Sequence, residues 1–193
     1  MQEALTHINW LDIVIIVVLI SGMVVGYTQG MLRQLLVLGA VVVSLVLSAQ
    51  YYQLIYLYVR QLEPNMIETV AQVITFFVVM FVLVVVLTIV LIDVMRRLNQ
   101  QQKPAGSMSR VIGGALGLIV AGMFVTISLI ALTFMTLNTW PGTGEALREW
   151  LVSARQRSDF VAVFRLFFPL ILQIIRPWVP ALPPLFSIDI NNI

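Results

Sequence analysis

The stretch Gly26-Tyr27-Thr28-Gln29-Gly30-Met31-Leu32-Arg33 decides how this chain is organised. It is a polar break in an apolar run that extends from residue 11 to about residue 47. Glycine adopts a positive φ at little steric cost, so Gly26 and Gly30 favour a tight turn here. We therefore expect the tip of a membrane hairpin, with Arg33 anchoring the second helix at the interface. A re-entrant or gating element is the alternative for these glycines, since interrupted membrane helices mark transport sites in some folds.

The composition excludes an ordinary soluble fold. Hydrophobic residues make up 60% of the chain and charged residues 10%, and the mean hydropathy is +1.00. Soluble domains average roughly 45–50% apolar and 25% charged residues. The net charge of +2 is small and dispersed, which argues against nucleic acid as a partner. Cysteine is absent, so disulfides and thiolate metal sites are excluded.

Four apolar segments are each long enough to cross a bilayer, because about 20 residues span a hydrocarbon core of ~30 Å. The expected spans are about 11–26, 31–50, 70–92 and 111–137, arranged as two hairpins. The second continues into tyrosines 51, 52, 56 and 58, which are typical of an interfacial belt. Residues 93–110, with Arg96, Arg97 and Lys103, are expected to be a charged, flexible loop. The sequence thus predicts an all-α membrane protein whose four-helix membrane domain covers residues 1–142.

Residues 143–193 are expected to form an amphipathic interfacial helix and a proline-rich tail. Between residues 145 and 159 one face is apolar, and the arginines lie away from it; the residues concerned are Leu147, Trp150, Leu151 and Ala154 against Arg148, Arg155 and Arg157. These arginines are expected to contact anionic head groups. Residues 160–175 are a weaker candidate for a fifth span, because a central Arg165 costs roughly 2.5–3.5 kcal/mol. The prolines after Arg176 predict an extended or disordered end.

Small residues recur every four positions on two spans, which places them on one helix face. They are Ser109, Gly113, Gly117 and Ala121 on the fourth span, and Ala40, Ser44 and Ser48 on the second. Such faces let helices approach closely in lipid, so we expect helix packing within the monomer. An oligomer seam and a pore lining are the alternatives. The expected partners are therefore membrane lipid and either a second copy or another membrane protein.

No arrangement of residues predicts an enzyme. Asp12 and Asp93 border the spans at opposite ends, about 30 Å apart, which is too far for a carboxylate dyad. Both are expected to be surface residues, with Asp93 paired to Arg96 or Arg97 one turn on. His7 is alone, so no metal site is expected. A phosphate-binding glycine loop and a Gly-x-Ser-x-Gly elbow are also missing from the sequence, and no cofactor is expected.

The loop charges predict an orientation. The tip and the third connection carry Arg33, Arg96, Arg97, Lys103 and Arg110, whereas the short second connection carries only Arg60. The positive-inside rule then places residues 27–33 and 93–110 in the cytoplasm and both termini outside. The arginines that follow the fourth span oppose this assignment.

Three sequence features, spread over residues 10–125, resemble the colicin V production protein (CvpA) family of bacterial inner-membrane proteins. They are Trp10-Leu11-Asp12, Gly26-x-x-x-Gly30-x-x-Arg33 and Arg110-x-x-Gly113-x-x-x-Gly117. The chain departs from that family at Gln29, where a basic residue is common, and at Gln34, where Glu is common. The resemblance implies a multi-pass inner-membrane protein that is an accessory in bacteriocin production or export, or in envelope homeostasis. A small oligomeric transporter or channel is the alternative.

Overall fold

The computed structural model describes residues 9–64, 66–98, 106–142, 144–179 and 182–187, and in these residues the expected all-α membrane fold is confirmed. Four helices are long and apolar enough to cross a membrane: α2 (Trp10–Gln29), α3 (Met31–Leu62), α4 (Glu68–Leu98) and α5 (Ser107–Met135). They are followed by α6 (Gly144–Gln156), α7 (Asp159–Arg165), α8 (Phe168–Ile175) and the short 3₁₀ helix η1 (Pro184–Phe186). His7 and Lys103 lie outside the described residues.

The breaks between helices are narrower than the sequence suggested. A single residue, Gly30, separates α2 from α3, so Gly26 lies inside a helix instead of in the turn. Likewise α4 continues to Leu98 and α5 begins at Ser107, which shortens the loop predicted at residues 93–110. The ion pair between Asp93 and Arg97, 2.8 Å apart and one turn along α4, supports this extra helix. Basic residues in the last turn also interact favourably with the helix dipole.

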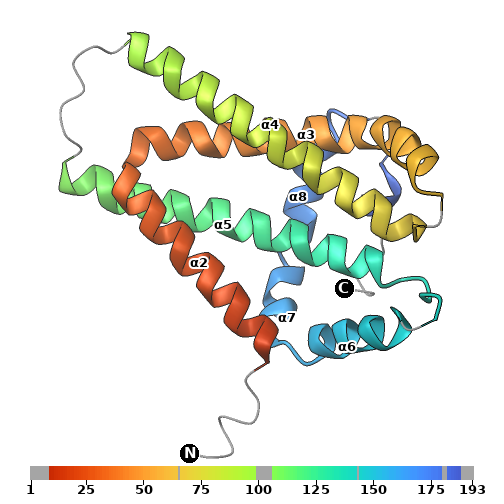
Figure 1. Ribbon diagram of the computed structural model, residues 1–193. Coiled ribbons are helices and arrows are strands. Elements are labelled where there is room, and N and C mark those ends of the chain that lie inside the picture. Colours follow the sequence, from red (N-terminus) through yellow and green to blue (C-terminus); the bar gives the residue numbers. More distant parts are fainter. Residues whose placement is uncertain (1–8, 65, 99–105, 143, 180–181, 188–193) are drawn as a thin grey trace, which may run out of the picture.

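The spans pack in the order α4, α3, α5, α2. Helix α2 packs mainly on α5, α3 packs mainly on α4, and α3 and α5 meet in the middle of the bundle. Sequence neighbours α2 and α3 diverge from their shared turn at Gly30 (Figure 1). That turn lies at the same end of the bundle as the end of α4 and the start of α5 (Figure 1). The main partner of α2 is therefore the helix most distant from it in the sequence among the four spans.

Two of the four tyrosines at the end of α3 belong to the core instead of an interfacial belt. Tyr52 is fully buried and Tyr56 is 5% exposed, whereas Tyr51 and Tyr58 are exposed. The Tyr52 ring meets Phe76 of α4 edge to face, with 5.7 Å between ring centroids. Helical periodicity explains the difference, because residues 52 and 56 lie one turn apart on the face toward α4 and α5.

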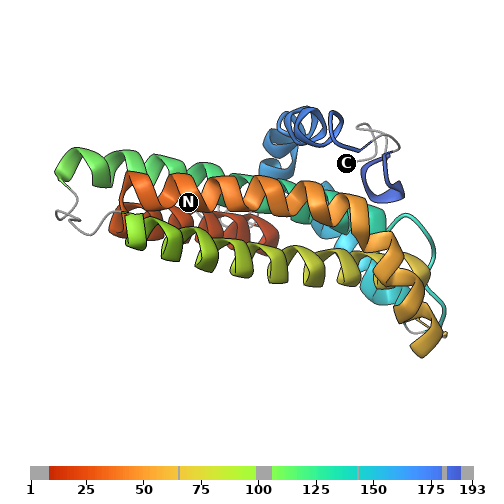
Figure 2. The same cartoon turned by 90° about the horizontal axis from the view of Figure 1, so that it is seen from above.

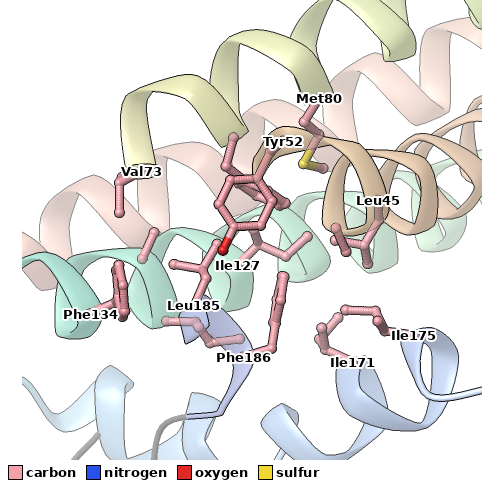
Figure 3. Close-up of a cluster of buried hydrophobic side chains, with 14 of the residues drawn as sticks. Leu45, Tyr52, Val73, Met80, Ile127, Phe134, Ile171, Ile175, Leu185 and Phe186 are labelled. Carbon is pink, nitrogen blue, oxygen red and sulfur yellow. The ribbon is translucent and has the colours of Figure 1, made fainter. Parts of the chain in front are cut away.

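The C-terminal segment shares this core with the bundle. Side chains of α8 and η1 point between α3 and α5 and meet Tyr52 and Leu45 (Figure 3). The sequence predicts an extended or disordered end. Leu185 and Phe186 are each 1% exposed, so the second of these alternatives is wrong for residues 182–187. The apolar surface that these two side chains bury orders a segment whose prolines rule out a regular long helix.

Residues 159–175 form two short helices, not one straight span. The unit of α7 and α8 is bent by 74° from α6. In Figure 2 these helices lie along one side of the bundle. By length and composition, the described residues contain four candidate spans, and a fifth only if α6 and the unit of α7 and α8 together form one bent span.

Candidate functional site

The contact between α2 and α5 is made by glycine backbone. Gly113 and Gly117 of α5 are buried against Gly22 and Gly26 of α2. A methyl group added at Gly117 would lie 2.9 Å from the Cα atom of Gly26, and one added at Gly26 would lie 2.9 Å from the Cα atom of Gly117. Side-chain carbons do not approach backbone this closely. Ala121 extends the contact to Gly22, so α2 occupies the small-residue stripe of α5 within the monomer.

The turn between α2 and α3 is fixed to the start of α5. Gly30 has φ 79°, in the left-handed region that favours glycine, and its N–H donates to the Gly26 carbonyl over 3.0 Å. The N–H of Met31 donates to the Ser109 hydroxyl over 3.1 Å. Arg33, in the first turn of α3, is exposed, as expected close to the turn between α2 and α3. The tip residues Gly26, Gly30 and Arg33 thus differ in role, because only Gly30 supplies the turn.

A cavity of about 290 Å³ lies beside this turn, between α2, α3 and α5. Gln29 and Gln34 line it, and their side-chain Oε1 atoms are buried with no hydrogen-bond partner among the described residues. Gln34 is only 3% exposed. A buried amide oxygen without a donor costs about 1–3 kcal/mol. The cavity therefore offers acceptors to a water molecule or to a polar group.

The second small-residue stripe, on α3, is buried as well. Ala40, Ser44 and Ser48 are each 0% exposed. The hydroxyl oxygens of Ser44, Ser48 and Tyr56 have no partner among the described residues. Because these residues are spaced by multiples of four, the hydroxyls follow one face of α3 inside the bundle. This face differs from the α2–α5 contact, which is made by glycine backbone.

The first residues of α2 hold the C-terminal segment, through contacts that we call the latch. Trp10 stacks on Trp150 of α6, with 4.7 Å between ring centroids and 2° between ring planes. The Asn9 side chain caps α2 by accepting from the Leu11 N–H over 3.3 Å, and it donates to the Ala154 carbonyl. The latch therefore joins residues that are far apart in the sequence, 145 positions for Asn9 and Ala154.

Asp12 is the buried member of the latch. Its carboxylate accepts a hydrogen bond from the Ser158 hydroxyl and another from the Phe160 N–H over 3.4 Å. Ser158 in turn caps α7 by accepting from the Val161 N–H over 3.2 Å. Asp12 is 8% exposed, so the prediction of a surface residue is wrong. The reason is the return of the C-terminal segment to this end of α2, which covers the carboxylate while supplying its donors.

A second set of polar contacts holds α6 to the end of α5. The Glu145 carboxylate accepts from the Trp140 N–H over 2.7 Å and from the Arg148 Nε over 2.9 Å. Arg148 also donates to the Thr136 carbonyl over 3.1 Å. The Arg148 guanidinium, followed by the Trp140 N–H, lowers the pKa of Glu145. Arg148 is therefore engaged within the protein, and Trp150 is engaged by the latch.

The remaining arginines of α6 differ from each other. The Nε and Nη1 atoms of Arg155 are buried without an acceptor among the described residues. Burial lowers the pKa of Arg155, and the nearby charge of Arg165 lowers it further. Arg157 is exposed.

Acidic residues and other possible metal ligands are dispersed in the described part of the chain. Within the described residues, there is no group of three or more His, Cys, Asp or Glu side chains that would hold a metal ion. Asp12 lies at the start of α2, whereas Asp93 pairs with Arg97 at the far end of the bundle.

Sequence reasoning missed Gly22 and Ser158. A signal for Gly22 exists, since Gly22-x-x-x-Gly26-x-x-x-Gly30 repeats every four residues on the face that meets α5. Ser158 has no comparable local signal, because its partner Asp12 is 146 positions away in the chain.

The chain was compared with protein families, with curated proteins and with solved structures, and only the comparison with families gives a match. No curated protein and no solved structure matches the chain. The family described as colicin V production protein matches residues 11–165, which include all four spans, the glycine contact and most of the latch. The match therefore covers most of the sequence, and the chain belongs to the colicin V production protein family.

Proposed function

We propose that this protein is a non-enzymatic accessory protein of the bacterial inner membrane that acts in bacteriocin production or export, or in envelope homeostasis. Membership of the colicin V production family supports a role of this kind in the membrane. The observation that carries the proposal is the absence of charge in the central part of each span. Residues 13–29, 34–59, 69–92 and 111–135 contain no Asp, Glu, Lys or Arg. Pathways for ions usually expose a charged residue at this depth.

An accessory protein needs a surface for a membrane partner, and the outward face of α4 is one candidate. It lies at the edge of the bundle and packs mainly on α3. Its outward face is apolar and open, with Val78 57%, Phe81 69% and Ile89 63% exposed. In lipid such a face binds another helix through van der Waals packing, not through the hydrophobic effect. We place the partner, whether another membrane protein or a second copy, on this face.

Gene deletion with complementation tests the role. Loss of the protein from a producing bacterium is expected to lower bacteriocin release or tolerance to detergent, and the full chain is expected to restore it. Single-cysteine crosslinking then finds the partner, because the chain has no native cysteine. A cysteine at exposed Phe81 is expected to crosslink, and one at fully buried Phe76 is the control. If deletion changes neither property, the accessory role is wrong.

A small oligomeric transporter is the second candidate, and one feature of α3 favours it. Ser44 and Ser48 place buried hydroxyls, without partners among the described residues, along one helix face inside the bundle, and polar side chains inside a bundle can mark a substrate path. The variant Ser44→Ala with Ser48→Ala separates the two functions. An accessory protein keeps its activity, whereas a transporter loses solute flux into reconstituted vesicles.

The proposed topology places residues 27–33 and 93–110 in the cytoplasm and both termini outside. The excess of basic residues at that end of the bundle supports it. Reporters that are active only inside or only outside the cytoplasm, fused after Pro141 and after Ile193, test it. Both fusions are expected to report outside. A cytoplasmic signal after Ile193 alone would mean that α7 and α8 cross the membrane.

A further inference from the structure

The cavity between α2, α3 and α5 has a polar end and an apolar end. Gln29 and Gln34 line its polar end and lie on either side of Gly30, where α2 and α3 meet (Figure 1). Val18 of α2 and Phe124 of α5 line the other end. Residues 18 and 29 of α2 are 11 positions apart, which corresponds to about 16 Å at 1.5 Å per residue. The cavity therefore extends from the end of a span toward its middle, and its polar groups lie only at the end of the span.

The cavity is open on the side where α2 and α3 diverge. Val18, Ser21 and Val25 of α2 line it and are exposed, whereas Gln34 is buried. The Ser21 hydroxyl already donates to the Val17 carbonyl over 2.7 Å. The volume of about 290 Å³ is about ten times the ~30 Å³ that a water molecule occupies in the liquid. The cavity is thus larger than a bridging water requires, and its apolar walls suit a section of hydrocarbon chain.

The unpartnered atoms at the polar end are hydrogen-bond acceptors. The Oε1 atoms of Gln29 and Gln34 are buried and accept no hydrogen bond from the described residues. The described residues that line the cavity include no Asp, Glu, Lys or Arg. A ligand with a net charge would therefore be buried without a counter-charge, which is costly. A zwitterion carries its own counter-charge, and a primary ammonium beside a phosphate also offers three N–H donors.

We propose that this cavity binds one zwitterionic phospholipid with a primary ammonium head group. The ammonium lies at Gln29 and Gln34, and part of an acyl chain lies along Val18 and Val25. A lipid in a bilayer has this same arrangement, because its head group lies at the interface and its chains extend toward the middle. A water molecule or a free amine would leave the apolar end unused. The proposal goes beyond the accessory role and does not depend on it, since it rests on this cavity alone.

Lipid competition on the purified full chain tests the head group. The protein in mild detergent is mixed with equal amounts of dioleoylphosphatidylethanolamine and dioleoylphosphatidylcholine, and native mass spectrometry identifies the bound lipid. The two lipids share their acyl chains, phosphate and net charge, but the quaternary ammonium of the second has no N–H donor. The ethanolamine lipid is expected to bind about tenfold more tightly, because only its charged head group donates hydrogen bonds to the amide oxygens.

Two variants test the amides. The double variant Gln29→Met, Gln34→Met keeps side chains of similar length but removes both amide oxygens, and it is expected to lose the preference. Arg33→Gln is the matched control, because it removes an exposed charge next to Gln34 in the sequence and leaves both amides in place. This control is expected to keep the tenfold preference. Circular dichroism and size-exclusion chromatography verify that each variant remains folded.

A second pair of variants tests the apolar part of the cavity. Val25→Trp places a large ring in the cavity and is expected to lower the binding of the ethanolamine lipid about tenfold. Val24→Trp is the matched control. Val24 is the neighbouring residue on α2 and is also exposed, but it is not among the residues that line the cavity.

Four results would overturn the proposal. Equal binding of the two lipids would mean that the cavity does not recognise the head group. A preference that persists in Gln29→Met, Gln34→Met would place the ammonium elsewhere. Displacement of the lipid by free ethanolamine would indicate a soluble amine as the ligand. Equal effects of Val24→Trp and Val25→Trp would mean that the acyl chain lies outside the cavity, which then holds water only.

Discussion

Helix α2 is held at its two ends in different ways. Toward the turn, Gly22 and Gly26 lie against the backbone of α5, where no room exists for even a methyl group. At its start, side chains of Asn9, Trp10 and Asp12 hold the C-terminal segment. The glycine contact depends on close packing of backbone atoms, which leaves no space for a side chain. The latch divides its energy over several contacts, so it should tolerate the loss of one.

The largest expected effect comes from a side chain in the glycine contact. In Gly117→Leu the new Cβ would lie 2.9 Å from the Gly26 Cα atom, so α2 must move away from α5. Overpacking against side chains costs typically 1–3 kcal/mol, and backbone yields less readily, so we expect a loss of about 3 kcal/mol or more. Unfolding by denaturant in detergent micelles measures it. Gly39→Leu on α3, where the added carbon meets no atom of the described residues within 4 Å, should unfold like the wild type. Equal stability of the two variants would contradict the glycine contact.

Loss of the buried carboxylate in the latch should cost less. Asp12→Ala leaves the Ser158 hydroxyl and the Phe160 N–H without their acceptor, for a loss of about 1–3 kcal/mol. Asp12→Asn keeps an acceptor and should cost less than the alanine variant. The same unfolding measurement applies, with Asp93→Ala as control, because the exposed pair of Asp93 and Arg97 contributes about 0.2–1 kcal/mol. An equal loss in both alanine variants would place Asp12 on the surface after all.

The stacking of Trp10 on Trp150 should contribute less to the free energy of unfolding than the buried carboxylate does. Stacked aromatic pairs are worth about 0.5–1.5 kcal/mol beyond the area they bury. A double-mutant cycle of Trp10→Ala and Trp150→Ala isolates this coupling from the other losses. The pair Trp10 and Trp178 is the control, since Trp178 is 67% exposed and lies outside the latch. Additive losses at Trp10 and Trp150 would mean that the rings do not interact.

The glycine contact and the latch also differ in how far the sequence predicts them. Regular spacing reveals a face, so the stripe of Gly113 and Gly117 is visible in the sequence. The spacing does not name the opposing helix, because small residues fit any close backbone. Only the structure shows that this face meets α2.

The latch and the C-terminal segment escaped prediction for a different reason. Asp12 and Ser158 are 146 positions apart, and no local pattern links them. The prolines near residue 180 suggested disorder, yet Leu185 and Phe186 fill the core beside Tyr52 (Figure 3). A run of two apolar residues has no periodicity from which burial can be inferred. Hydropathy sufficed for the four spans because each is a long, uninterrupted signal.

A low pH should weaken the contacts of the latch, at the start of α2, and leave the glycine contact unchanged. This is the smallest effect that we predict. Glu145 and Arg148 position α6, which carries Trp150 of the latch, and Arg148 lowers the pKa of Glu145 below its ordinary value of 4.5. Since the ionised carboxylate is favoured in the folded state, its contribution is complete above pH 4.5 and is lost as the pH falls through the lowered pKa. Thermal unfolding of wild type and Glu145→Gln should therefore differ at pH 7 and converge at lower pH, whereas exposed Glu149→Gln should follow the wild type. A difference that persists unchanged to pH 3 would show that Glu145 stabilises α6 by shape and not by charge, and would leave both ends of α2 equally insensitive to acid.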